Sequence, residues 1–284
     1  MITAVAVSAG LAQQLQFEGY DALKAVNPAI VLLSVSNFGQ NGPYRDYLGS
    51  ETILYGMGGE MFSVGRVDRE PLKQGGTVAL FQAGGAATVA AMAGLMAAKR
   101  HGDGQWIDLS IYEVMASSAD RRVQTMTAYA FSGQIQVRQE EAIFFSSGIF
   151  PCADGYVELF AEQTKWGRFV QMLGSPESLL DGRWLRPGAL SDPALKDEFD
   201  AVFYPWLMSH GKREIWELCA KSTILCAPLY TPEDLMADPV IRERGTWTEV
   251  EHAVMGMVEV PGRPFIMSET PWQLRRAAPL LDSI

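Results

Sequence analysis

The chain has 284 residues, of which 48% are hydrophobic and 20% charged. This is enough for one or two globular domains with a core, and it excludes a disordered protein. A formal net charge of −10 makes non-specific binding to nucleic acid or to an anionic membrane surface unfavourable. We therefore expect no nucleic-acid and no membrane partner, and any anionic ligand would need a local basic patch.

The N-terminal region predicts strands of a parallel sheet. Residues 1–7 form a short apolar strand, so we expect the chain to begin part-way into a sheet. A helical pattern over residues 20–26 stops before Pro28. The continuous apolar run "AIVLLSV" at 29–35 is typical of a strand covered on both faces. The turn cluster at 36–43 then lies at its carboxyl edge, where open α/β sheets place ligands.

A third strand and two helices follow. Residues 84–100 predict a helix rich in small side chains, with basic residues at its end and breaks at Gly102 and Gly104. The stretch 86–98 is too short and too rich in small residues to predict a membrane span. Residues 105–111 predict a strand, and residues 112–131 predict one long helix that stops at Ser132 and Gly133.

The remaining chain predicts a smaller α+β unit. Residues 148–160 form two strands around an Ala-Asp-Gly turn, and helices follow at 165–173, 192–209 and 212–222. Thr231 precedes Pro232 as the N-cap of a further helix. The segments "WTEVEH" and "MVEVPG" then predict a hairpin.

The cysteines and histidines show no spacing typical of metal ligands, so we predict no metal site. An odd number of thiols fits a reducing compartment, and we expect the protein in the cytoplasm. The residues in question are Cys152, Cys219, Cys226, His101, His210 and His252.

Six segments, in order along nearly the whole chain, carry a resemblance to a known family. They are "YDALKAVNPAIV", "SVSNFGQNGPYRD", "GDGQWIDLSIYEV", "GIFPCADGYVELF", "APLYTPEDLMADPVIRERG" and "VPGRPFIMSETPWQLRRAAPLL". Together they resemble the class III CoA-transferase family, which includes formyl-CoA transferase, carnitine CoA-transferase and alpha-methylacyl-CoA racemase.

The resemblance implies an α/β fold with a Rossmann-like large domain, here incomplete at its N-terminus, and a small α+β domain. We expect a large-domain remnant with a long connecting helix at 1–135, a small domain at 136–225 and a return to the large domain at 226–284. It also implies an interlocked dimer, and coenzyme A or acyl-CoA as a ligand without a metal or a covalently bound cofactor.

The family's catalytic position is altered in this chain. In the family's transferases an aspartate attacks the acyl-CoA and later carries CoA as an enzyme thioester. The pattern around it, Val-Ala-Asp-Leu-x-Ala-Gly, aligns with "VALFQAG", which places Leu80 at the nucleophile. No Asp or Glu lies between Glu70 and Asp103 that a shifted alignment would restore. We therefore expect no catalytic residue of the usual kind.

Two carboxylates are candidate substitutes, each with a structural alternative. Glu51 follows Ser50, which stands where the racemases have histidine, and is otherwise a solvated carboxylate at a helix start. Glu113 is otherwise explained by the dipole of the helix whose first turn it occupies. By aligned position the residues expected near CoA are Gln14, Leu15, Ser50, Gln82 and Ile111. The family's polar CoA-contacting segment is replaced by "VAVSAG".

Three functions remain open at the level of sequence. The chain is a non-catalytic or auxiliary subunit, in a homodimer or in a heterodimer with a full-length catalytic homologue. Alternatively, it is an active acyl-CoA transferase that uses another carboxylate, or a truncated and non-functional homologue. The acyl group and the acid substrate carry no sequence signature, because specificity resides in the shape of a pocket.

Overall fold

The computed structural model describes residues 4–8, 19–118, 122–135, 138 and 144–280. They belong to two compact units, Met1–Glu141 and Ala142–Ile284. The predicted boundaries at 135 and 225 and the predicted return of 226–284 to the large domain stay predictions.

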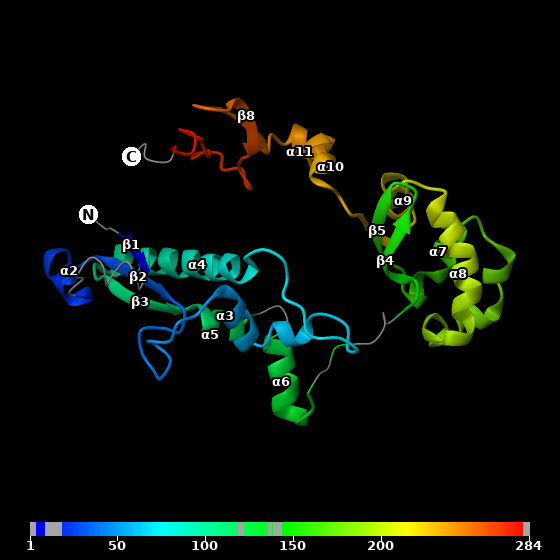
Figure 1. Cartoon of the computed structure of the whole chain (residues 1–284), viewed down its shortest axis with the longest axis horizontal. Coiled ribbons are helices and arrows are strands. Elements are labelled where there is room, and N and C mark those ends of the chain that lie inside the picture. The colour runs from blue at the N-terminus through cyan, green and yellow to red at the C-terminus, as the bar shows by residue number, and fades with distance from the viewer. Residues whose placement is uncertain (1–3, 9–18, 119–121, 136–137, 139–143, 281–284) are drawn as a thin grey trace. The chain divides into compact units, whose positions relative to one another are not determined.

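A three-stranded parallel sheet forms the first unit's framework (Figure 1). Its order is β1 (Ala4–Ser8), β2 (Val31–Ser36) and β3 (Gln105–Ser110), which confirms the predicted strands. The N-terminal half of β2 is fully buried, as its unbroken apolar sequence predicts. Helix α2 (Tyr20–Val26) precedes β2.

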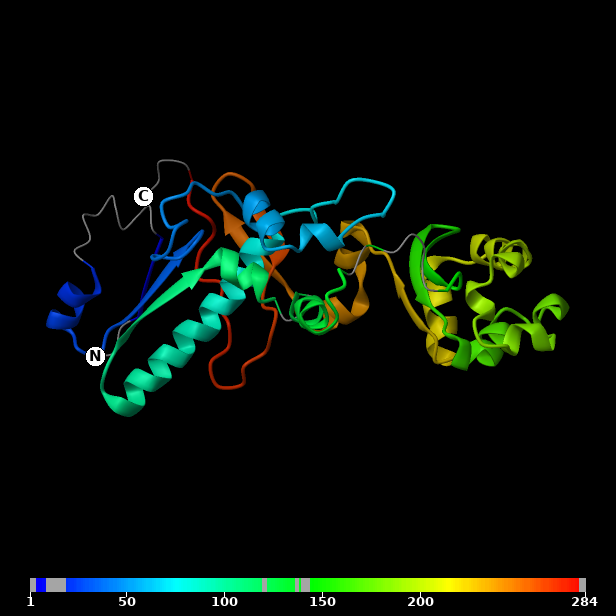
Figure 2. The same ribbon diagram turned by 90° about the horizontal axis from the view of Figure 1, so that it is seen from below.

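The long helix α4 (Val78–His101) runs along β2 and β3 (Figures 1 and 2). A Cβ added at Gly94 would lie 2.9 Å from side-chain atoms of both Val31 and Ile107, so the absent side chain allows close packing. The predicted start at residue 84 is wrong, because the helix begins at Val78. Ala79 and Ala83 are buried, and this tertiary packing continues the helix through Gly84 and Gly85.

The outer side of α4 carries large apolar side chains in contact with solvent. The exposed side chains are those of Leu80, Phe81, Val89, Met92 and Met96. By length and composition alone, α4 is long and apolar enough to cross a membrane. Residues 86–98 alone are too short, but the helix that contains them is longer, so the prediction was wrong about the length. Its packing on a parallel sheet is that of a helix in an α/β layer.

The helix predicted at 112–131 is two helices. α5 (Ile111–Ala116) begins at Ser110, whose hydroxyl accepts a hydrogen bond from the Glu113 amide at 3.2 Å. α5 ends at Ser117, whose side chain donates to the Glu113 carbonyl at 2.6 Å and offers the backbone an alternative to continued helix. α6 (Arg122–Ser132) is a separate helix. The shorter elements of this unit are α3 (Glu51–Met57) and η1 (Met61–Ser63).

The second unit is built on an antiparallel sheet in the order β4-β5-β6. The predicted α+β pattern is confirmed. Its strands are β4 (Ser147–Cys152), β5 (Gly155–Phe160) and β6 (Leu225–Pro228). Its helices are α7 (Trp166–Met172), α8 (Pro193–Met208) and α9 (Lys212–Lys221), with one-turn helices η2 (Gln163–Lys165), η3 (Glu177–Leu179), η4 (Gly182–Leu185) and η5 (Ala189–Ser191).

Among the described residues of this unit, 20 buried residues between Phe150 and Ile224 form one core. Its centre is aromatic: the rings of Trp166 and Trp184 stack with centroids 5.1 Å apart, and those of Phe199 and Phe203 lie 4.9 Å apart. Each of these four side chains is at most 2% exposed. Large rings packed in this way supply most of the apolar burial that a small domain needs.

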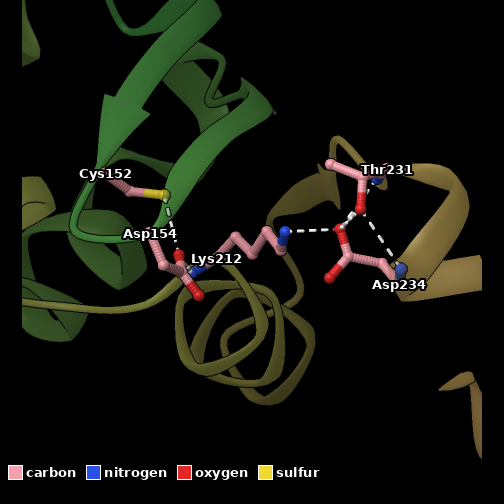
Figure 3. A network of polar contacts seen from close by, with 5 residues as sticks. All are labelled: Cys152, Asp154, Lys212, Thr231 and Asp234. Carbon is pink, nitrogen blue, oxygen red and sulfur yellow. Dashed lines mark hydrogen bonds and ion pairs between the residues drawn. The ribbon is translucent and has the colours of Figure 1, made fainter.

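A polar network joins this core to the segment after β6 (Figure 3). In the turn between β4 and β5, Asp154 accepts the Lys212 amide at 2.7 Å and so caps α9. The Lys212 Nζ pairs with Asp234 Oδ2 at 2.6 Å, and Asp234 forms a capping box with Thr231, the predicted N-cap. The ammonium of Lys212 and the hydrogen bonds from Thr231 lower the pKa of Asp234 to about 2.

The last described elements are short. α10 (Pro232–Ala237) and α11 (Pro239–Glu243) lead into the antiparallel pair β7 (Trp247–His252) and β8 (Gly256–Pro261). The pair confirms the predicted hairpin.

Candidate functional site

The candidate site lies at the carboxyl ends of β2 and β3. The loop after β2 is fixed there, because its Gln40 amide donates to Asp108 Oδ2 at 2.8 Å and its Asn37 carbonyl accepts from the Tyr112 amide at 3.0 Å. Asp108 belongs to β3 and Tyr112 to α5, so the predicted turn cluster lies across the edge where parallel sheets hold ligands.

The starts of α3, α4 and α5 meet at this edge. Leu54 of α3, Ala83 of α4 and Ile111 of α5 pack in one buried cluster with Phe38. A second cluster brings Tyr55, Ala79 and Met115 together from the same helices. The structure thus gathers three segments that are distant in sequence and that hold most of the predicted site residues.

Leu80 lies in the first turn of α4 with 44% of its surface exposed. Its neighbour Ala79 is completely buried, so the turn is held by Ala79 and presents the leucine outward. A hydrocarbon side chain has neither a lone pair for attack nor a proton to transfer. The position at which the resemblance expects a nucleophile is therefore accessible but chemically inert.

Glu51 places a carboxylate beside this turn. Its Oε1 accepts a hydrogen bond from the Ala79 amide at 3.1 Å, and its Oε2 pairs with Lys73 Nζ at 2.8 Å. The side chain of Glu51 is only 12% exposed, which differs from the solvated carboxylate weighed as its structural alternative. A negative charge at this point accepts a hydrogen bond from an otherwise free amide of α4. It also interacts favourably with the positive end of the α4 dipole.

Lys73 is the member of this site that sequence reasoning missed. Besides Glu51, its ammonium donates to the carbonyls of Gln74 and Gly76, so it orders the loop that leads into α4. The pairing spans a loop and a helix start 22 residues apart in the sequence. No local pattern marks such a contact, although a lone cation before a glycine pair was a visible feature.

The other predicted residues have more ordinary surroundings. Ser50 caps α3 by accepting the Ile53 amide at 3.5 Å and is exposed. Gln82 is half-buried in α4, and Ile111 is a core residue. Glu113 is exposed in the first turn of α5, as the dipole reading expects. Gln14 and Leu15 lie outside the described residues.

The described residues contain no group of three or more His, Cys, Asp and Glu side chains that could hold a metal ion. The cysteine thiols lie in the second unit, and burial is the main cause that raises the pKa of Cys152. Cys219 hydrogen-bonds to Cys226, which together with burial raises the pKa of Cys219. Cys152 and Cys219 are therefore not activated thiolates, whereas the hydrogen bond with Cys219 lowers the pKa of Cys226.

Comparison with known proteins agrees with this arrangement. The profile of CoA-transferase family III matches residues 5–283. The succinate–glutarate CoA-transferase of Agrobacterium fabrum is 32% identical over 267 residues, and the succinyl-CoA–L-malate CoA-transferase beta subunit of Chloroflexus aurantiacus is 26% identical over 277 residues. The alignments cover 92% and 93% of this chain but 65% of each relative, so the chain spans about two thirds of their length.

The fold also matches a solved structure. A CAIB/BAIF family protein from Brucella suis superposes with a TM-score of 0.80 at 24% identity, covering 99% of this chain and 72% of that protein. At this identity the match supports the fold alone. Taken with the profile match over almost its whole length, it shows that the chain belongs to CoA-transferase family III.

Proposed function

We propose that this chain is a non-catalytic, auxiliary subunit of a cytoplasmic CoA-transferase, which moves CoA between an acyl-CoA thioester and a carboxylic acid. The observation that carries the proposal is the exposed side chain of Leu80, the residue that the sequence pattern aligns with the family's nucleophile. The nearest carboxylate described there, that of Glu51, has both oxygens engaged by Ala79 and Lys73.

The names of the relatives support a partner and a substrate class. L-malate CoA-transferases of Chloroflexus aurantiacus have separate alpha and beta subunits, both similar to this chain. By analogy we propose that a partner subunit supplies the reacting aspartate while this chain completes the fold and the interface. Succinyl-CoA recurs as the donor in the relatives' names, so we propose a dicarboxylate thioester as the substrate class.

A second candidate is an active transferase in which Glu51 replaces the aspartate. Its carboxylate lies at the start of α4, hydrogen-bonded to the residue before Leu80. In that reaction a Glu51 oxygen attacks the thioester carbonyl carbon, the C–S bond breaks, the CoA thiolate leaves and a mixed anhydride forms. The engagement of both oxygens and the burial of the side chain favour the auxiliary role.

An exchange assay separates the two candidates. The purified single chain is incubated with succinyl-CoA and a labelled dicarboxylate, and hydroxylamine traps any thioester or anhydride formed on the protein for mass spectrometry. We expect neither CoA exchange nor a trapped adduct. Exchange that Glu51→Gln abolishes while Glu113→Gln leaves it intact would establish the second candidate instead.

Leu80→Asp tests whether the rest of the site is intact. If only the nucleophile is missing, this variant should exchange CoA at least ~10³-fold faster than Leu80→Asn, since loss of a covalent nucleophile costs orders of magnitude in rate. The asparagine variant is the matched control because it adds a polar group of the same shape without a carboxylate. Equal and undetectable exchange in both variants would mean that the chain lacks more than the nucleophile. Co-purification would then test whether a partner supplies the missing contacts.

A further inference from the structure

A cavity of about 580 Å³ opens on the second unit, between α7 and the turn that follows α9. Two cations and two hydroxyl groups line it, and no carboxylate is among its described lining residues. The lining residues are Arg168, Gln171, Met172, Lys221, Ser222 and Thr223. In a chain with a net charge of −10, this cavity is a local basic patch of the kind that an anionic ligand requires.

Thr223, one of the residues that line this cavity, has an unusual backbone conformation. Its φ of 58° lies in the left-handed region, where a β-branched residue is a genuine outlier and glycine is the usual helix-ending residue. The turn is complete without a threonine side chain, because the amides of Thr223 and Ile224 bond to the carbonyls of Ala220 and Cys219. Strain of this kind is concentrated at functional positions.

The threonine side chain has a specific partner. Its hydroxyl accepts a hydrogen bond from Arg168 Nη1 at 2.5 Å, while its carbonyl accepts from Lys165 Nζ at 2.9 Å. The side chain therefore holds the guanidinium of Arg168 against the cavity, and the strained residue orients a cation. The positive charge of Lys165 offsets the negative end of the α9 dipole. Without this charge, that end of the helix would repel an anion.

The two cations that line the cavity have N–H donors that form no hydrogen bond within the described chain. A guanidinium carries five N–H groups. Within the described chain, Arg168 uses one of them in the hydrogen bond to Thr223. The Lys221 ammonium has no hydrogen-bond or ion-pair partner among the described residues. A guanidinium fork beside an ammonium and hydroxyl groups matches the geometry and charge of a phosphate group.

We propose that this cavity is a phosphate-binding site, in which Arg168 and Lys221 bind the phosphate oxygens and Thr223 positions Arg168. The site belongs to the second unit and goes beyond the proposed function, since it does not depend on which subunit carries the nucleophile. The phosphate belongs either to free inorganic phosphate or to the phosphorylated portion of a coenzyme A molecule. The same contacts serve both sources.

Isothermal titration with inorganic phosphate, coenzyme A and pantetheine tests the site, with sodium chloride matching the ionic strength. Arg168→Gln and Lys221→Gln should each weaken phosphate binding at least about tenfold, because each removes charge-assisted hydrogen bonds. Arg213→Gln is the matched control: it removes the same charge from α9, where Arg213 pairs with Glu217 at 3.4 Å, and should change binding less than twofold. Weakening of CoA but not pantetheine binding by Arg168→Gln identifies CoA as the source.

Thr223→Gly separates a positioning role from a purely structural one. Glycine relieves the left-handed strain, so the melting temperature should rise while phosphate binding weakens several-fold. A rise in melting temperature with unchanged binding would overturn the role of Thr223. Binding that is equal in Arg168→Gln, Lys221→Gln and Arg213→Gln, or absent in the wild type, would overturn the site.

Discussion

The two units differ in how their buried hydrophobic residues are grouped. The second unit gathers 20 buried residues in one aromatic core, whereas the site region of the first unit has two clusters of four and three. The first unit instead exposes large apolar side chains along α4. The aromatic core of the second unit is therefore closed within the unit, whereas α4 of the first unit presents an apolar surface suited to a covering layer.

The largest effect should come from the aromatic core. Phe199→Ala removes a fully buried ring that contacts Trp166, Phe169 and Phe203, and should lower the free energy of unfolding by about 3–5 kcal/mol. Phe81→Ala removes a phenyl ring from the exposed side of α4. This variant should change the free energy of unfolding by less than about 0.5 kcal/mol in the isolated chain. Urea unfolding followed by near-ultraviolet circular dichroism measures both. Similar losses would break the contrast between the units.

A pair of glycines on α4 should show which side of the helix is packed. A methyl group at Gly94 would lie 2.9 Å from the side chains of Val31 and Ile107, so Gly94→Ala should destabilise the protein by about 1–3 kcal/mol. Gly84 has open space around it, and Gly84→Ala should stabilise the helix by about 0.5–1 kcal/mol. The opposite signs are read from thermal unfolding, and equal effects would mean that α4 does not lie on the sheet.

The smallest effect concerns the ion pair between Lys212 and Asp234. Because the folded protein lowers the pKa of Asp234 to about 2, the pair contributes stability above the unfolded value of about 3.9, and this is lost as the pH falls towards 2. Between about pH 4 and 2, the free energy of unfolding of Asp234→Asn should therefore fall less than that of the wild type. An equal loss of stability in Asp234→Asn and in the wild type would contradict this role of the ion pair. Urea midpoints at each pH decide between these outcomes.

Much of the fold follows from local sequence. The apolar run of β2 predicted a strand in a parallel sheet, and Thr231 before Pro232 predicted a helix cap. The errors arose where tertiary contacts override local signals. Gly84 and Gly85 favour a helix start, but packing of Ala79 and Ala83 extends α4 past them to Val78. Ser117 ends α5 where the hydrophobic pattern continues.

The candidate site was predictable in its position and less so in its contacts. The turn after β2 and the altered residue Leu80 were visible in sequence, because the sheet edge and the family pattern are both local. The bonds from Glu51 to Lys73 and to the Ala79 amide join segments that are 22 and 28 residues apart. Nothing in either segment specifies them before the chain folds.

The exposed side of α4 carries methionines whose oxidation reports whether another molecule covers this surface. Met92 and Met96 carry thioethers that are 54% and 68% exposed, whereas Met115 is fully buried in the same unit. Peroxide converts accessible methionines to sulfoxides, so the ratio of oxidation at Met96 to that at Met115 records the state of this surface in a single mass spectrum. A subunit that docks on α4 would slow oxidation of Met96 to the rate of the interior residue, without any label or mutation.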